Sequence, residues 1–328
     1  MIARTAPFPR RFARAFSALA YCAFALRAFA ADEVRADLTF KLPPGQVAKY
    51  RWTTFSNTES SGREKDQVFT LKKDLSLEMD LVLKGLARKT PGLPLSVKAE
   101  KYGYSEKTSI GSDVGEIVAM KGKFKVTHSG KVIVDSDNDV GLEEIKNLQQ
   151  GLKQIEAGEM VVTLDPAGKE IGEAEGDETA IDVIKGSGAE GLFRLLAGRE
   201  LKPGDSWEDS QTLPNMATFK LAKPAVIRSK STFVGWETKD GKRLARIDVA
   251  STWDTSDLKG ENGEGLLVEI TRVEGKGAGR CYFDPALSRV VDGELSVNSK
   301  YRIDGKKDGQ STGLDVVGKT VFSFKEIP

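Results

Sequence analysis

Few side chains in this sequence are of the types that catalyse reactions or bind metals. The 328 residues include one histidine, His128, and two cysteines, Cys22 and Cys281. His128 lies in Thr127-His128-Ser129-Gly130, which is typical of a hairpin tip, and no second histidine or nearby cysteine completes a metal site or a Ser-His-Asp set. We therefore expect no catalytic residue, no metal and no cofactor, and hence no enzymatic activity.

One acidic cluster has the spacing of the start of a calcium loop. Asp135, Asp137 and Asp139 occupy its first positions, but the sixth is Val140 where glycine is needed and the twelfth is Lys146 where glutamate is needed. Turn formation and capping of a following helix by Asp139 explain the cluster better.

A glycine motif resembles a nucleotide-binding loop. Gly186-Ser187-Gly188-Ala189-Glu190-Gly191 matches GxGxxG, but the chain then runs into Lys202-Pro203-Gly204-Asp205 and an antiparallel meander. A dinucleotide fold requires a parallel strand and an acidic residue about 20 positions further on. We expect no nucleotide site here.

A hydrolase or a glycan-processing enzyme is the alternative to a non-enzymatic protein. Paired carboxylates could serve a hydrolase, since the chain has 48 acidic residues. Trp207, Trp236 and Trp253 could stack on sugars, although tryptophan in a sheet protein is more often packed in the core or across strands. The sequence alone does not bring any of these groups together.

Charge and composition exclude several classes of protein. Lys and Arg number 49 against 48 Asp and Glu, but residues 1–30 hold five arginines and no acid, so the remaining 298 residues carry four more acids than bases. That balance predicts no nucleic-acid partner. The 39% hydrophobic content fits one large or two ordinary globular domains and excludes a disordered or polytopic membrane protein.

The N-terminus has the three-part plan of a signal peptide. Basic residues precede an apolar run of 12 residues from Ala15 to Leu26, and Ala28-Phe29-Ala30 follows as a cleavage motif. A membrane-spanning helix needs about 20 residues. The sequence therefore predicts an exported protein, periplasmic or extracellular, with no membrane span after cleavage; an uncleaved anchor and lipidation at Cys22 are the alternatives.

Cleavage after Ala30 would leave Cys281 as the one cysteine of the mature chain. No intramolecular disulfide is then possible, so the fold depends on its hydrophobic core. We expect Cys281 to be a buried, inert thiol in a strand.

The clearest predicted element is a strand from Phe69 to Leu83. Seven of its eight odd positions are apolar, which is the period-two pattern of a strand with one buried face. At about 3.4 Å per residue it would span on the order of 50 Å, so it must bend or coil.

The C-terminal half repeats the strand pattern. Predicted strands cover 226–238, 243–253, 266–283, 290–303 and 320–324, with Asp240-Gly241 as a hairpin signal between the first two. Each connection is too short for a crossover helix. The predicted fold is mainly β: one or two long, curved antiparallel meander sheets, with a half-open barrel as one form.

Two stretches are predicted to be helical and to lie on the concave face. Leu142, Ile145, Leu148, Leu152 and Ile155 form an apolar stripe, and a second stretch near 178–197 is interrupted by glycines. The predicted organisation is therefore a signal peptide at 1–30, a β-rich half with both helices at 31–200, and a β-meander half at 201–328.

The two halves also share a weak echo. Each opens on a Leu-x-Pro-Gly turn, at 42–45 and 201–204, and each contains an Asp-Pro-Ala turn late in its length, at 165–167 and 284–286. Internal duplication and a coincidence of turn chemistry both explain this.

Several of these segments, in this order, resemble a known family. They are Asp135-Ser136-Asp137, the helix from Leu142, the run 160–169 and the run 201–207. The order is similar to a family of exported bacterial β-rich proteins classed as a domain of unknown function, over most of residues 45–305. The resemblance implies a fold and carries over no functional residue. A second, architectural resemblance is to the half-open β-barrels of lipoprotein carriers.

We expect a binding role in the cell envelope, in one of two forms. A carrier would hold a lipid or another apolar ligand between sheet and helix, whereas an interaction module with a protein partner would fill its sheet with its own side chains. A cavity of several hundred Å³ distinguishes the first from the second, and the module is the initial preference; the oligomeric state is left open. The candidate residues for the ligand or core face are Leu75, Leu77, Met79, Leu81, Leu148 and Leu152.

Overall fold

The computed structural model describes residues 35–64, 67–87, 91–120, 123–216, 219–254, 258–261, 267–307 and 310–328. The chain divides into two units, Met1–Arg35 and Ala36–Pro328, and the second contains all the elements described below. The predicted signal peptide and Cys22 lie outside the described residues.

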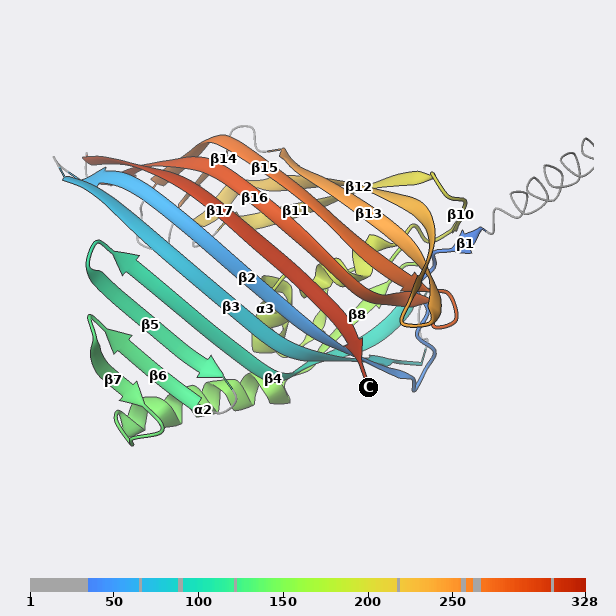
Figure 1. Cartoon of the computed structure of the whole chain (residues 1–328), viewed down its shortest axis with the longest axis horizontal. Coiled ribbons are helices and arrows are strands. Elements are labelled where there is room, and N and C mark those ends of the chain that lie inside the picture. The colour runs from blue at the N-terminus through green and yellow to red at the C-terminus, as the bar shows by residue number, and fades with distance from the viewer. Residues whose placement is uncertain are drawn as a thin grey trace, which may run out of the picture. The chain divides into compact units, whose positions relative to one another are not determined.

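A large antiparallel sheet forms the body of the second unit (Figure 1). Twelve strands follow one another across it: β11 (Ser206–Met216), β12 (Phe219–Lys239), β13 (Lys242–Asp254), β15 (Leu267–Asp284), β16 (Arg289–Lys307), β17 (Gln310–Ile327), β2 (Val47–Glu64), β3 (Gln67–Gly85), β4 (Leu93–Ile110), β5 (Asp113–Met120), β6 (Lys123–His128) and β7 (Lys131–Asp135). Three further strands attach to this path: β14 (Leu258–Glu261), β8 (Met160–Leu164) and β9 (Glu175–Gly176). A separate pair is formed by β1 (Ala36–Asp37) and β10 (Glu200–Leu201). The predicted mainly β, meander-type fold is confirmed.

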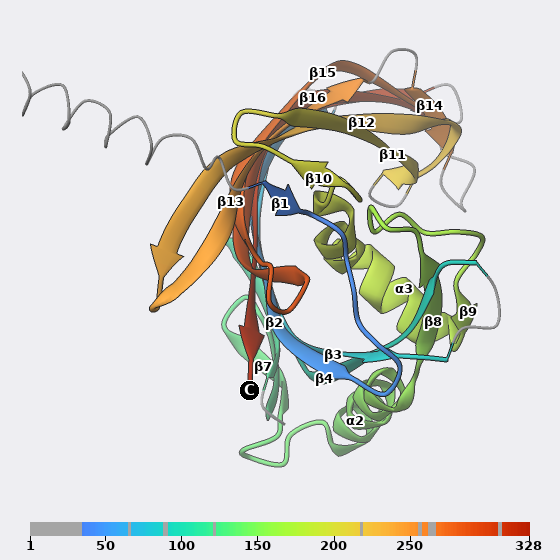
Figure 2. The same cartoon turned by 90° about the vertical axis from the view of Figure 1, so that its right-hand side faces the viewer.

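The predicted long strand is β3, and its two faces alternate as expected. Leu77, Met79, Leu81 and Leu83 are buried on one face, and Leu75 is half-buried beside them. The long strands twist and coil together into a strongly curved sheet (Figure 2). The other face of β3 carries polar side chains such as Thr70, Lys72 and Glu78.

Both halves of the chain belong to this one sheet. The last strand, β17, pairs along its length with the first long strand, β2, as in Val321 opposite Phe55. The Asp240-Gly241 hairpin is confirmed, since both residues have the positive φ that a type I′ turn requires. The division of the chain at residues 200 and 201 stays a prediction.

The echoed turns have the same structure in each half. Gly45 and Gly204 both adopt positive φ, and in each case the next amide donates to the carbonyl three residues back, as in a type II turn. Asp165 and Asp284 each accept from the backbone amide two residues on. The two halves therefore share the conformation and the hydrogen bonding of these turns.

Both predicted helical stretches are present. They form α2 (Leu142–Ala157), α3 (Glu178–Gly186) and a 3₁₀ helix, η1 (Ala189–Leu195). The expected capping of α2 by Asp139 is wrong: Gly141 is the N-cap, in a left-handed conformation without a side-chain cap. Asp139 itself has positive φ in the turn before it.

The helices pack on different parts of the sheet. Ile145 of α2 packs with Ala119, Phe124 and Val134 in a small cluster over β5–β7. α3 and η1 lie over the main core, inside the curve of the sheet (Figure 2), through residues such as Ile184 and Phe193.

An extended segment before β2 forms a strap across the end of the core. Ala36, Leu38, Phe40 and Leu42 are all buried, which is a period-two pattern that the sequence analysis missed. Three backbone hydrogen bonds attach the strap to turns that are distant in the sequence. Leu38 N donates to Arg199 O, Phe40 N to Pro166 O and Lys41 N to Ser288 O. The strap (residues 36–42) therefore links both halves.

The strap should contribute strongly to stability. Phe40 is 6% exposed and packs edge-to-face on Phe193, with ring centroids 5.9 Å apart, whereas Phe55 is 52% exposed on β2. We expect Phe40→Ala to lower the free energy of unfolding by about 3–5 kcal/mol, the usual cost for a buried phenylalanine. Phe55→Ala should change it by about 0.5 kcal/mol or less. Urea denaturation of both variants measures this, and equal effects would show that the strap is peripheral.

A bulge between β3 and β4 surrounds a buried carboxylate. The strand register shifts between Glu78 and Asp80; Asp80 pairs with Glu100, and Lys101 in the bulge after it has positive φ. Arg51 donates to both oxygens of Asp80, at 2.9 and 3.2 Å, and Lys101 Nζ lies 3.1 Å away. Burial raises the pKa of Asp80, but the hydrogen bonds and charges of Arg51 and Lys101 outweigh it and hold that pKa below its usual range.

We expect the buried Asp80 carboxylate to make a pH-dependent contribution to stability. We expect Asp80→Asn to lower the free energy of unfolding by about 1.5–3 kcal/mol at neutral pH, the value for hydrogen bonds to charged groups. Because the folded-state pKa is depressed, the contribution is complete above the unfolded-state pKa of about 3.9 and disappears as pH falls through the folded-state pKa.

Urea titrations of wild type and Asp80→Asn from neutral to strongly acidic pH test this. Glu59→Gln is the control, because Glu59 pairs with Lys72 at 3.5 Å where both side chains are exposed. A difference between wild type and Asp80→Asn that stays constant into strong acid would contradict the assignment.

Candidate functional site: a cavity on the concave face

Strand register shows which side chains share the concave face. One row across it reads Val249, Gly279, Leu295, Phe322, Thr54 and Leu77, each opposite the next on the neighbouring strand. The next row reads Ser251, Gly277, Val297, Thr320, Ser56 and Leu75. The predicted face of β3 and the inner faces of β13 and β15–β17 are therefore one continuous surface.

A cavity of about 430 Å³ lies between this surface and the α3–η1 segment. Most of its lining is apolar and comes from both the sheet and η1: Trp52, Leu192, Leu195, Ile227, Val249, Trp253, Leu295, Val297, Phe322 and Phe324. Hydroxyl groups of Ser229, Ser231, Ser251, Ser299 and Thr320 also line it. Leu295, Val297 and Phe322 keep intermediate exposure, so the cavity is open to solvent.

Aromatic packing closes one end of the cavity. Trp52 stacks on Phe324, with ring centroids 6.0 Å apart and planes 6° apart, and contacts Phe322 at 6.0 Å. The Trp52 indole donates to Thr54 Oγ1 at 3.0 Å, and Thr54 Oγ1 donates to the Ser187 carbonyl at 3.5 Å. These contacts attach the junction of α3 and η1 to the sheet.

Glycines on alternate positions of β15 make room beneath the cavity. A Cβ added at Gly275 would overlap the Trp253 ring, one at Gly277 the Ser251 hydroxyl, and one at Gly279 the Glu294 carbonyl. Glycine at these three positions therefore lets neighbouring side chains and backbone approach β15 closely.

Charged side chains gather at one rim of the cavity, where η1 meets β11. Arg194 Nε lies 3.2 Å from an Asp209 oxygen, and Lys169 Nζ lies 2.7 Å from the other. Lys185 donates to both oxygens of Glu170, at 3.0 and 3.1 Å. Lys185, Arg194 and Asp209 line the cavity itself.

Two other hollows have more polar linings. One of about 600 Å³ lies over the outer face of β2 and β15–β17 and is lined largely by Asn, Ser, Lys, Asp and Glu. One of about 710 Å³ lies between α2 and the β4 bulge, where Arg51, Glu78, Lys101, Lys153 and Glu156 contribute. The cavity beneath α3–η1 is therefore the best site for an apolar ligand.

The β3 residues predicted for a ligand or core face lie in or against the core and are not among the residues that line this cavity. Leu77, Met79 and Leu81 are buried in the main core, and Leu75 packs against it. Leu152 of α2 packs against the small cluster and lines the hollow near β4. The side chain of Leu148 lies outside the described residues.

The sequence analysis did not identify the residues that line the cavity, because no motif or spacing relates them. Val249 and Trp253 lie on the predicted strand 243–253, and Leu295 and Val297 on the predicted strand 290–303, but nothing in the sequence joins these strands to η1. Arg194, Lys185 and Asp209 have no motif, and only the fold brings them together.

The other candidate motifs occupy structural positions. Asp135 accepts from the Asp137 amide and from Asn138 in a turn. The GxGxxG run joins α3 to η1, with Gly188 at positive φ. His128 ends β6 before a Ser129-Gly130 turn, with its Nε2 3.6 Å from Asp113.

Cys281 is buried on β15, and burial raises the pKa of its thiol. A raised pKa disfavours the reactive thiolate, in agreement with the inert role predicted for it.

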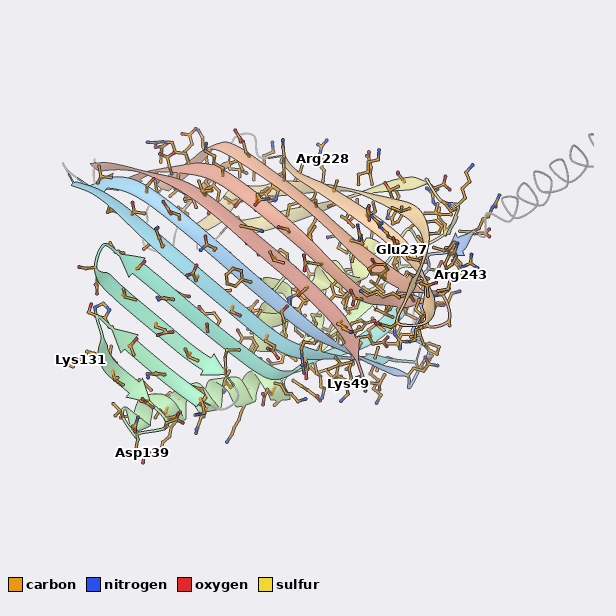
Figure 3. The ribbon with its side chains drawn as sticks, in the orientation of Figure 1. Lys49, Lys131, Asp139, Arg228, Glu237 and Arg243 are labelled. Atoms are coloured by element: carbon orange, nitrogen blue, oxygen red, sulfur yellow. The ribbon has the colours of Figure 1, made fainter. Side chains whose placement is uncertain are left out.

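Charged side chains cover the outer face. Arg246 pairs with Glu237 and with Asp248, each at 2.8 Å, and Lys239 pairs with Asp292 at 2.9 Å. Figure 3 labels Glu237 and Arg228 on this part of the sheet. Within the described ranges, no group of three or more His, Cys, Asp or Glu could hold a metal, and no helix has the length and hydropathy to cross a membrane.

Comparison with known proteins gives no family. No family model and no curated protein matches the sequence. A structure of lipid–protein interactions in lipovitellin is similar at a TM-score of 0.44 and 13% identity, over 88% of this chain and 26% of that chain. The chain thus spans about a quarter of the lipovitellin chain that it matches.

Two bacterial proteins are similar at lower scores. One is the translocator domain of the autotransporter NalP from Neisseria meningitidis, with a TM-score of 0.18 and 7% identity over 93% of this chain and 96% of that chain. The other is Pseudomonas aeruginosa OpdL, with a TM-score of 0.16 and 8% identity over 86% of this chain and 99% of that chain. Scores this low do not establish a shared fold, and we draw nothing from them. The resemblance to exported β-rich bacterial proteins stays a prediction.

The close packing at the glycines of β15 predicts that a glycine-to-alanine substitution there is more destabilising than one on β5. Gly279→Ala places its Cβ on the Glu294 carbonyl, whereas a Cβ at Gly115 on β5 would have no neighbour nearer than 4.0 Å. We expect Gly279→Ala to lower the free energy of unfolding by about 1–3 kcal/mol. Gly115→Ala should be neutral or slightly stabilising. Thermal denaturation of both variants measures this, and equal melting temperatures would contradict close packing at β15.

Proposed function

We propose that this protein is a non-enzymatic carrier that binds an apolar or amphipathic small molecule between its concave sheet and α3–η1. The observation that carries the proposal is the apolar cavity of about 430 Å³. Small-molecule sites are typically hollows of about 300–1,000 Å³ with mainly apolar and aromatic linings. An interaction module with a filled concave face predicts no such cavity, so the structure favours the carrier over the initially preferred module.

Binding is also favoured over hydrolysis. A hydrolytic carboxylate pair would need one carboxyl group with a raised pKa. In the described part of the chain, every carboxyl group with a shifted pKa has it lowered, because hydrogen-bond donors and cations outweigh burial. These groups are Asp37, Asp80, Glu106, Asp135, Glu159, Glu237 and Asp248.

Export to the periplasm or the cell exterior is part of the proposal. Its support is the arginine-rich start, the 12-residue apolar run and the Ala28-Phe29-Ala30 motif. Native mass spectrometry of protein purified from its own envelope tests both parts at once. The expected result is a chain beginning near Ala31 with a co-purified small molecule; a chain that retains residues 1–30 would overturn export.

Tryptophan fluorescence tests the cavity directly. Trp253 lines the cavity, whereas Trp236 lies outside it, with the guanidinium of Arg243 4.7 Å from its ring centroid. We expect a long-chain bromoalkanol to quench the emission by close contact. Trp253→Phe should remove a large part of the quenching, and Trp236→Phe should leave its amplitude unchanged. No quenching, or equal losses in the two variants, would place the ligand elsewhere or exclude it.

A further inference from the structure

The rim where η1 meets β11 has the chemistry to recognise an anionic group. Three cations, Lys169, Lys185 and Arg194, meet two carboxylates, Glu170 and Asp209. The rim therefore holds one more positive than negative charge. These charges lie at the edge of the apolar floor of the cavity, which is formed by the sheet residues Val249, Leu295, Val297 and Phe322. An amphiphile with a charged head would fit this arrangement.

The Arg194–Asp209 contact is incompletely satisfied. Arg194 Nε and Asp209 Oδ1 are buried atoms that make no hydrogen bond in the described structure, although both lie within ion-pair distance of an opposite charge. Trp207 Nε1, two residues before Asp209 on the same face of β11, is a third such atom. Buried polar atoms are normally paired, so the two unpaired atoms of Arg194 and Asp209, both residues of the cavity lining, indicate a place for a further polar group.

We propose that the cavity selects amphiphiles with an anionic head, a carboxylate or a phosphate, bound by Arg194 and Lys185 with the chain lying on the apolar floor. This inference rests on the proposed carrier function and names its ligand class. A planar carboxylate or a phosphate can accept two parallel hydrogen bonds from a guanidinium. Asp209 reaches Arg194 through Nε alone, while Nη2 donates to the Ser210 carbonyl at 3.1 Å.

Asp209 therefore competes with the ligand for the same cation. Its carboxylate occupies the position next to Arg194 that a ligand head would take, and its side chain is only 14% exposed. Lys169 lies 2.7 Å from Asp209 and can retain that carboxylate when Arg194 turns to the ligand. Removing the negative charge of Asp209 should thus strengthen the binding of an anionic head, which a purely structural role would not predict.

Three ligands with the same alkyl chain test the head group: an alkanoate, an alkyl phosphate and a neutral alkanol, titrated into the full mature chain. We expect either anion to bind at least about ten-fold tighter than the alkanol, a difference of about 1.4 kcal/mol. The tighter of the two anions identifies the head as carboxylate or phosphate. The preference should weaken as ionic strength rises.

Variants assign the preference to the rim. Arg194→Gln and Lys185→Gln should each reduce anion affinity several-fold and leave alkanol affinity unchanged, while Asp209→Asn should raise anion affinity several-fold. Lys319→Gln is the matched control, because Lys319 is exposed on the outer face of β17. Asp209→Asn keeps the test decisive if Arg194→Gln does not fold.

The outcomes separate the two proposals. Equal binding of alkanol and anions, or an Asp209→Asn variant that binds anions no better than wild type, would overturn the head-group assignment and leave the carrier standing. Failure of all three ligands to bind would overturn the carrier function itself.

Discussion

Backbone hydrogen bonding between long antiparallel strands decides which side chains meet on each face of this sheet. Since the side-chain period is two, a shift of one residue in any pair would turn leucines outward and lysines inward. The pairing of β2 with both β3 and β17 keeps Trp52, Met79 and Phe324 on the same side. The core, the cavity and the charged exterior all follow from that register.

The cavity exists because the two parts of the concave face are filled differently. Over β3 and β4, large side chains such as Met79, Leu81 and Leu95 complete the core. Over β15, successive inward positions are Gly275, Gly277 and Gly279, and the next strand, β16, contributes Leu295, Val297 and Ser299 to the cavity lining. Leu192 and Leu195 of η1 line the opposite side of the cavity.

The sequence predicted the strands far better than the site. Alternation in 69–83 and the Asp240-Gly241 signal are local, so β3 and the β12–β13 hairpin were readable directly. The strap was missed because four alternating positions are too few to distinguish a short strand from a loop. Leu75, Leu77, Met79 and Leu81, named from the sequence as a ligand or core face, lie in or against the core, and the cavity lies beside them. Apolar periodicity shows that a face is covered, and not whether side chains or a ligand cover it. Arg194, Lys185 and Asp209 come from three elements, and no spacing along the chain relates them.

The pairing of β2 with β17 also sets an order of events in folding. β2 is the first long strand to be synthesised, and its partner on one side is the last. Until that partner arrives, β2 presents an unpaired edge, which is a template for association with other chains. Contacts between residues so far apart in sequence also slow folding. The β2–β17 pairing can therefore form only after residues 310–327 are available, and loss of β17 would remove the strand that joins β16 to β2.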